Sequence, residues 1–146
     1  MTLSKKIEMY IDQFETKQRN EETIVVFKSG ASAELRDSVM KAHGDRLPDD
    51  WIFNTYHSIL CALSEYTIEK EDDLEENRGE IVDGLVDVYT SNLTTWLNSH
   101  NSNVYYLEEA QKEFGPIEDG FKLLSTAQYM AIDEIYSEVI ELLTAE

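Results

Sequence analysis

The amino-acid sequence predicts an all-α protein, a compact bundle of five to six helices. Apolar residues recur at spacings of three and four along most of the chain, which places them on one face of a helix. Hydrophobic residues make up 42% of the 146 residues and aromatic residues 10%, enough to build a core. Short turns rich in Gly, Pro or Asn separate the periodic segments. Helices joined by short connections are typical of a bundle.

The first third of the chain predicts two helices, and it contains one segment that could be a strand. Residues 3–14 carry a helical apolar stripe, and the polar run 15–22 follows it. Residues 23–27, T-I-V-V-F, have the composition of a short strand but no evident partner strand. Ser32 can cap a helix that continues to residue 43 and is stopped by Gly44.

The rest of the chain predicts the helical core. Leu47-Pro48-Asp49-Asp50 opens a helix that runs to about residue 66, because Pro and acidic residues suit a first turn. A second apolar stripe covers residues 81–97, and the polar turn 98–103 follows. A helix over residues 104–114 then ends at Gly115-Pro116. The last helical segment starts at about Glu118, with an interruption expected near Thr126.

Length and charge divide one domain into two parts. A chain of 146 residues fits a single domain. Residues 1–46 hold eight basic and eight acidic side chains, whereas residues 47–146 hold four basic and 22 acidic ones. The formal net charge of -18 therefore belongs entirely to the second part. This charge disfavours direct binding of nucleic acid, which needs a basic patch, and favours a basic protein partner.

The strongest functional signal is the stretch 65–87. It contains ten acidic residues against only Lys70 and Arg78. Six of its acids alternate at spacings of four and three, so a fully helical stretch would carry them in a single file: Glu69, Asp73, Glu76, Glu80, Asp83 and Asp87. The pitch of such a file, about 5 Å per charge, resembles the phosphate spacing of DNA. Gly79 and Gly84 each cost a helix about 1 kcal/mol, which favours a loop followed by a helix.

Signatures of catalysis, cofactor binding and metal binding are missing from the sequence. No glycine-rich phosphate loop is complete, and His43, His57 and His100 lack metal-ligand spacing. A calcium loop from Asp73 fails because Arg78 occupies the position that requires Gly. Cys61 with His57 four residues earlier invites a thiol nucleophile, but nothing supplies an oxyanion site. We therefore expect no enzyme, no cofactor and no metal site.

The sequence also bears on location. Cys61 is the only cysteine, so no internal disulfide can form, which agrees with a reducing compartment. The N-terminus lacks the apolar segment of a signal peptide, and no window reaches the length of a membrane span. We expect a cytoplasmic protein without a membrane partner, in the host cytoplasm if a phage encodes it.

The middle of the chain resembles a known family. Leu47-Pro48, the helix that runs into I-L-C-A-L-S-E at residues 59–65, the acidic stretch, and L-T-T-W-L at residues 93–97 look like the phage antirestriction DNA mimics of the Ocr group. The resemblance covers roughly a third of the chain. It implies an all-α, acidic, dimeric protein whose carboxylates replace phosphates in the DNA cleft of restriction enzymes. D-V-Y-T at residues 87–90, with L-T-T-W-L, is also similar to small uncharacterised phage and plasmid proteins.

We therefore expect a non-enzymatic inhibitor that occupies the DNA-binding cleft of a host defence enzyme of the restriction-modification or CRISPR type. The expected phosphate mimics are Glu65, Glu69, Asp72, Asp73, Glu76, Glu80, Asp83 and Asp87, flanked by Asp49, Asp50, Glu108 and Glu109. The alternative is an acidic interaction or adaptor domain without DNA mimicry. Its charge would serve only solubility, and its contact would be an aromatic patch such as one at Tyr105 and Tyr106.

Overall fold

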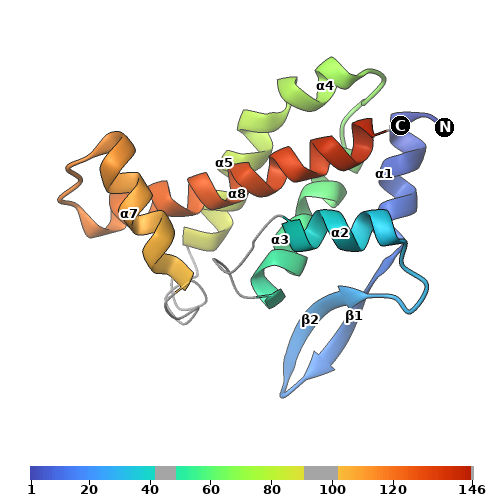
Figure 1. The fold of residues 1–146 in the computed structure, drawn as a ribbon, viewed down its shortest axis with the longest axis horizontal. Coiled ribbons are helices and arrows are strands. Elements are labelled where there is room, and N and C mark those ends of the chain that lie inside the picture. Colours follow the sequence, from blue (N-terminus) through green and yellow to red (C-terminus); the bar gives the residue numbers. More distant parts are fainter. Residues whose placement is uncertain (42–48, 91–101, 146) are drawn as a thin grey trace.

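The structure is a computed structural model that describes residues 1–41, 49–90 and 102–145. Within these residues the protein is mainly helical and carries one two-stranded antiparallel sheet. If α4 and α5, which only Asn77 separates, are counted together, the described residues hold six helices. The elements in order are α1 (Leu3–Ile11), β1 (Phe14–Arg19), β2 (Glu22–Phe27), α2 (Ala33–Lys41), α3 (Asp49–Ser64), α4 (Glu71–Glu76), α5 (Arg78–Thr90), α7 (Ser102–Phe114) and α8 (Gly120–Thr144) (Figure 1).

The β-hairpin corrects the expectation of a purely all-α fold. The segment 23–27 is a strand as its composition indicated, and its partner is the polar run that was expected to be only a connection. Strand β1 buries Phe14 and then faces water, so its other positions need no apolar side chain. Asn20 and Glu21 close the hairpin with positive φ angles of 51° and 69°, the conformation that matches the twist of two paired strands.

The central helix α8 is 25 residues long and supports the core (Figure 1). Helices α1, α2, α3, α5 and α7 all contact it. The interruption expected near Thr126 is absent: α8 continues through this residue, whose hydroxyl donates a hydrogen bond of 2.7 Å to the Lys122 carbonyl within the helix. At the C-terminal end of α8, Lys6 Nζ donates to the carbonyls of Leu143 and Ala145, which complements the helix dipole.

Helices α2 and α3 follow the sequence prediction. The Ser32 hydroxyl accepts a hydrogen bond from the Leu35 amide, as expected for a helix cap. Helix α3 buries the predicted apolar stripe, which includes Trp51, Ile52, Tyr56, Ile59, Leu60 and Leu63. The expected stop at Gly44, the opening at Leu47-Pro48 and the stripe beyond residue 90 lie outside the described residues.

Most buried polar groups of the core are paired. The Ser38 and Tyr56 hydroxyls are 2.6 Å apart, and the Thr55 and Tyr89 hydroxyls are 2.8 Å apart. Gln128 on α8 is the exception: its side chain is fully buried, and neither amide atom has a hydrogen-bond partner in the described part of the chain. A buried amide without partners costs stability, about 1–3 kcal/mol.

We expect Gln128→Leu to raise the free energy of unfolding by about 1 kcal/mol, because it replaces an unpartnered amide by an apolar group of similar size. The control is the same change at Gln111, whose amide bonds both the amide and the carbonyl of Ile117. Gln111→Leu should lower stability by about 1 kcal/mol. Urea unfolding followed by circular dichroism measures both. A loss of stability in Gln128→Leu would contradict the assignment.

Candidate partner-binding surface

The acidic stretch is a loop followed by helix, as expected, but the helix is divided into α4 and α5 at Asn77, and both glycines lie inside α5. Its first part, with Glu65 and Glu69, connects α3 to α4 outside any helix. Helix α4 then ends at Asn77, and α5 starts at Arg78. The six carboxylates therefore do not form the single file that a fully helical stretch would give, because the connection and the break at Asn77 interrupt it. In Figure 1, α4 lies above α8, and α5 passes behind α8.

Most predicted phosphate mimics face solvent. The exposed ones are Glu65, Glu69, Asp72, Glu76, Glu80, Asp83, Asp87 and Glu108. Glu80, Asp83 and Asp87 follow helical spacing on α5, so they share one face over a rise of about 10 Å. The side chains of Asp49 and Asp50 lie outside the described part, although both residues open α3 as expected.

Asp73 has a structural function that the sequence reading missed. Its carboxylate accepts hydrogen bonds from the backbone amides of Glu69 and Lys70, at 2.9 and 3.1 Å. These bonds cap α4 and lower the pKa of Asp73 below its ordinary value of 3.8. Asp73 is therefore committed to the start of α4 and is a poorer phosphate mimic than the exposed acids. The signal was available in the sequence, since an acid three residues after a helix start is typical of a capping box.

Arg78 clamps the acidic helices to α8. Its guanidinium makes two hydrogen bonds of 2.9 and 3.0 Å to the Glu75 carboxylate and one of 2.9 Å to Asp133. It also donates to Ser137 at 3.0 Å and lies 4.9 Å from the centre of the Tyr136 ring. These contacts raise the pKa of Arg78, with the Glu75 hydrogen bonds as the largest cause. The side chain is mostly buried, which strengthens its ion pairs.

Two tyrosines interact with the acidic segments. The Tyr136 hydroxyl donates to the Leu74 carbonyl of α4, and burial raises its pKa to about 12. Desolvation and then the negative charge of Glu80 on α5 raise the pKa of Tyr66, which belongs to the connection before α4. Together with Arg78, the Tyr136 hydrogen bond fixes the backbone of α4, which carries exposed acids.

Acidic residues of α8 extend the surface. The pKa of Tyr129 is raised first by burial and then by Asp133 of α8 and Asp83 of α5. An acid of α5 and an acid of α8 therefore act on the same phenol through their charge. Sequence reasoning missed Asp133 as part of this surface, because the pairing of α5 with α8 cannot be read from spacing within one helix.

The negative charge of this surface is largely uncompensated. Of the four basic residues after position 46, Arg78 pairs with Glu75 and Asp133, and Lys112 pairs with Glu109 at 3.5 Å. Within the described residues no ion pair or hydrogen bond involves the side chains of Asp72, Glu76 or Asp83. Glu109 is half-buried and paired, so it is a weaker candidate than the exposed Glu108 on the same helix.

The aromatic patch expected for an adaptor domain is not at Tyr105 and Tyr106. Tyr106 is fully buried and donates a hydrogen bond of 2.6 Å to Glu134. Tyr105 is half-buried and packs edge-on against the Tyr106 ring. Exposed aromatic side chains lie instead at Phe114 and Phe121, where α7 meets α8. The helical stripe does not distinguish these positions from core positions, which is why the sequence did not reveal them.

The described residues offer no support for catalysis at Cys61. The Cys61 sulfur lies 3.6 Å from His57 Nε2, but burial raises the pKa of the thiol and lowers the pKa of the imidazole. Both shifts oppose formation of a thiolate. No group of three or more potential metal ligands occurs among residues 1–41, 49–90 and 102–145. In that same part of the chain, no helix is both long and apolar enough to span a membrane.

No protein-family model, curated protein or solved structure matches this chain. The site and its interpretation therefore depend on the residues and the geometry described above.

We expect Arg78→Met to lower the free energy of unfolding by about 1–2 kcal/mol, because Glu75 and Asp133 lose a shared partner and regain only water. Lys112→Met is the matched control, since it removes the same charge from an exposed pair and should cost less than about 0.5 kcal/mol. Thermal unfolding at several salt concentrations measures both. Equal losses would show that Arg78 contributes only its charge.

Asp73→Ala should lower the melting temperature most at neutral pH. The folded-state pKa of Asp73 is depressed, so its contribution is complete above pH 3.8 and is lost as the pH falls through the folded-state value. The difference in melting temperature between wild type and variant should therefore shrink below about pH 4. Asp72→Ala, one position earlier in α4, is the control and should show a smaller difference. A pH-independent effect of Asp73→Ala would contradict the carboxylate cap.

Proposed function

We propose that this protein is a non-enzymatic inhibitor that mimics the charge of DNA and occupies the DNA-binding cleft of a host defence enzyme. The enzyme would be of the restriction-modification or CRISPR type. One observation carries the proposal: exposed carboxylates follow the connection before α4, then α4, then α5, while Arg78, the basic residue among these helices, is used internally to hold them on α8.

The arrangement suits a cleft built for phosphates. Successive acids on one helix face are separated by about 5 Å, whereas phosphates along one DNA strand are separated by about 3.4 Å of axis. A cleft that binds DNA through lysine and arginine can therefore meet this surface with charges at a comparable density. Binding needs no base-specific contacts, because phosphate contacts contribute most of the affinity of nonspecific DNA binding.

Partner binding accounts for the excess of acidic residues better than solubility does. A solubilising face usually mixes both signs, and concentrated charge of one sign repels itself and weakens the compact state. Here four basic residues oppose 22 acids over the last hundred residues. A basic partner offsets this repulsion on binding, so the same charge that costs stability in the free protein gives affinity and a fast association rate.

Neutralising three exposed acids should weaken inhibition without unfolding the protein. The variant Asp72→Asn, Glu76→Gln, Asp83→Asn removes the negative charge of three side chains that make no ion pair or hydrogen bond within the described residues. We expect the protein concentration for half-inhibition of plasmid cleavage, by a restriction enzyme or a CRISPR nuclease, to rise at least about tenfold. Inhibition by wild type should also weaken steeply between low and high salt.

The control removes the same charge from the neutral part: Glu8→Gln, Glu34→Gln, Asp37→Asn, all exposed. It should inhibit like wild type, and circular dichroism should show equal helix content in all three proteins. If the control and the test variant lose inhibition equally, net charge alone is responsible. If the test variant inhibits like wild type, the proposed surface is wrong.

A further inference from the structure

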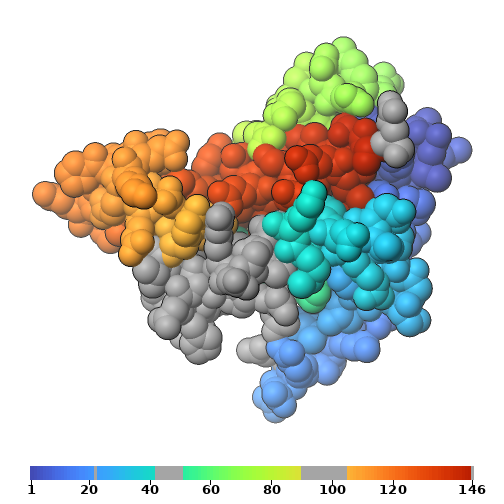
Figure 2. Space-filling view, in the orientation of Figure 1, coloured from blue at the N-terminus to red at the C-terminus, as the bar shows by residue number. Residues whose placement is uncertain are grey.

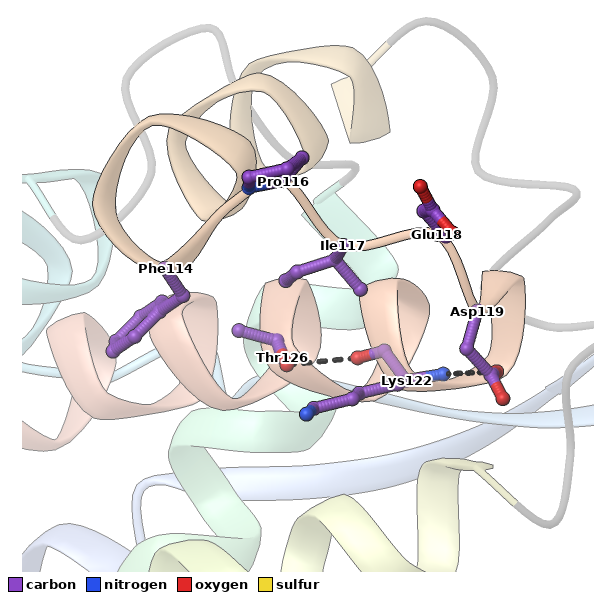
Figure 3. A pocket seen from close by; sticks show the side chains of 7 residues that line it. All are labelled: Phe114, Pro116, Ile117, Glu118, Asp119, Lys122 and Thr126. Atoms are coloured by element: carbon purple, nitrogen blue, oxygen red, sulfur yellow. Dashed lines mark hydrogen bonds between the residues drawn. The ribbon is translucent and has the colours of Figure 1, made fainter.

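The connection between α7 and α8 carries an open pocket of mixed polarity away from the acidic helices. Phe114, Pro116 and Ile117 line one side of it, and Lys122 and Thr126 on α8 line the other (Figure 3). Its volume is about 610 Å³. Phe114 is 59% exposed, and Phe121 in the first turn of α8 is 60% exposed. Figure 2 shows this end of the molecule, in orange, projecting from the body.

The pocket stands on a rigid connection. The Gln111 side chain bonds both the amide and the carbonyl of Ile117, at 2.8 and 3.0 Å, and its backbone carbonyl accepts the Gly115 amide at 2.9 Å. A Cβ at Gly115 would lie 2.1 Å from that carbonyl oxygen, so the close approach requires glycine. Phe114 lines the pocket on this hydrogen-bonded backbone, and Phe121 adds an exposed ring in the neighbouring first turn of α8. An exposed ring on a backbone that is already ordered loses less entropy on binding than one on a free loop, which suits an anchor site.

From this geometry we infer that the α7–α8 tip, defined as residues 114–126, binds an apolar side chain presented by a basic segment of the partner protein. The inference depends on the proposed function, because it adds an apolar contact to the same partner. Glu118 and Asp119 stand at the rim of the pocket beside the cation of Lys122 (Figure 3). The Asp119 carboxylate caps α8 by accepting the Lys122 amide at 3.0 Å, so Glu118 is the rim acid that faces a partner most freely. A lysine- or arginine-rich segment with a leucine or an aromatic residue complements both the rim and the pocket.

A second copy of this chain is a poorer occupant. Two molecules that each carry a formal charge of -18 repel one another. The apolar surface offered by Phe114, Phe121 and Ile117 is at most a few hundred square ångströms, whereas a stable interface buries about 800 Å² per partner. A small apolar patch contributes most beside a larger charged interface, where it acts as an anchor.

The contact made by the acidic surface and the contact made by the α7–α8 tip respond differently to salt. Exposed carboxylates steer association, and their contribution falls with salt. Burial of an apolar side chain in the tip slows dissociation and is not screened by salt. The tip therefore contributes an affinity gain that persists at salt concentrations where the acidic contribution is weak.

Two synthetic peptides test the inference on the intact protein. The first alternates lysine and serine, and the second has the same length and charge with leucine at its central serines. Fluorescence anisotropy gives their Kd values at low and high salt. We expect the leucine peptide to bind wild type about five- to tenfold more tightly at both salt concentrations, as burial of one leucine predicts.

The variant Phe114→Gln, Phe121→Gln should bind both peptides with equal Kd values. Both side chains are more than half exposed, so the fold should be kept. Met40→Gln, which removes a 52% exposed apolar side chain from α2, is the control and should keep the preference for leucine. A leucine preference that is absent in wild type, or that survives in the double phenylalanine variant, would overturn the inference.

Failure of the tip can be told from failure of the acidic surface. The variant Asp72→Asn, Glu76→Gln, Asp83→Asn should weaken both peptides equally and leave their ratio unchanged. If both peptides bind in a salt-dependent manner without a leucine preference, the tip inference fails and the proposed function stands. If neither peptide binds, both fail. Sedimentation equilibrium that shows self-association lost in Phe114→Gln would assign the tip to a second copy instead.

Discussion

The apolar face of α8 is the surface on which most of the other described helices pack. Ile132, Ile135, Tyr136 and Val139 are fully buried on it, and α1, α2, α3, α5 and α7 pack against it. Helix α4 has too few apolar residues to pack in this way and buries only Leu74. Two residues hold it instead. Tyr136 of α8 donates a hydrogen bond to the Leu74 carbonyl of α4, and Arg78 bonds both Glu75 of α4 and Asp133 of α8. The acidic surface therefore has a fixed geometry only because α8 is long, buried and continuous.

This dependence explains how the chain carries its charge. Like charges repel, so acidic helices on a small fold tend to separate from it. Two of the four basic residues of the acidic part are ion-paired in the described residues: Arg78 joins α4, α5 and α8, and Lys112 pairs within α7. Lys6, from the neutral part, caps the end of α8. Cations hold the scaffold together, and the acids that face solvent remain available to a partner.

The local sequence pattern predicted most of the helices. It did not predict the features that depend on contacts between segments far apart in the chain. The stripe from Trp51 to Leu63 gave α3, and Gly115-Pro116 gave the end of α7, because each signal is local. Strand β1 was missed because residues 15–19 are polar, and only pairing with β2 makes them a strand. The list of acids came from composition, but the cap at Asp73 and the pairing of Asp133 with Arg78 depend on folding. Exposure of Phe114 and burial of Tyr106 likewise follow from where α7 meets α8.

The spatial separation of charge gives the molecule an orientation before contact. The elements of the neutral part, α1, the hairpin and α2, lie together at one end of α8, and α7 lies at the other (Figure 1). A basic cleft therefore attracts the face with α4 and α5 and turns the neutral hairpin away, since the field of a protein steers approach over several ångströms. In that orientation the α7–α8 tip lies beyond one end of the acidic surface. A contact there would add selectivity among basic clefts, because phosphate-like charge alone suits any of them.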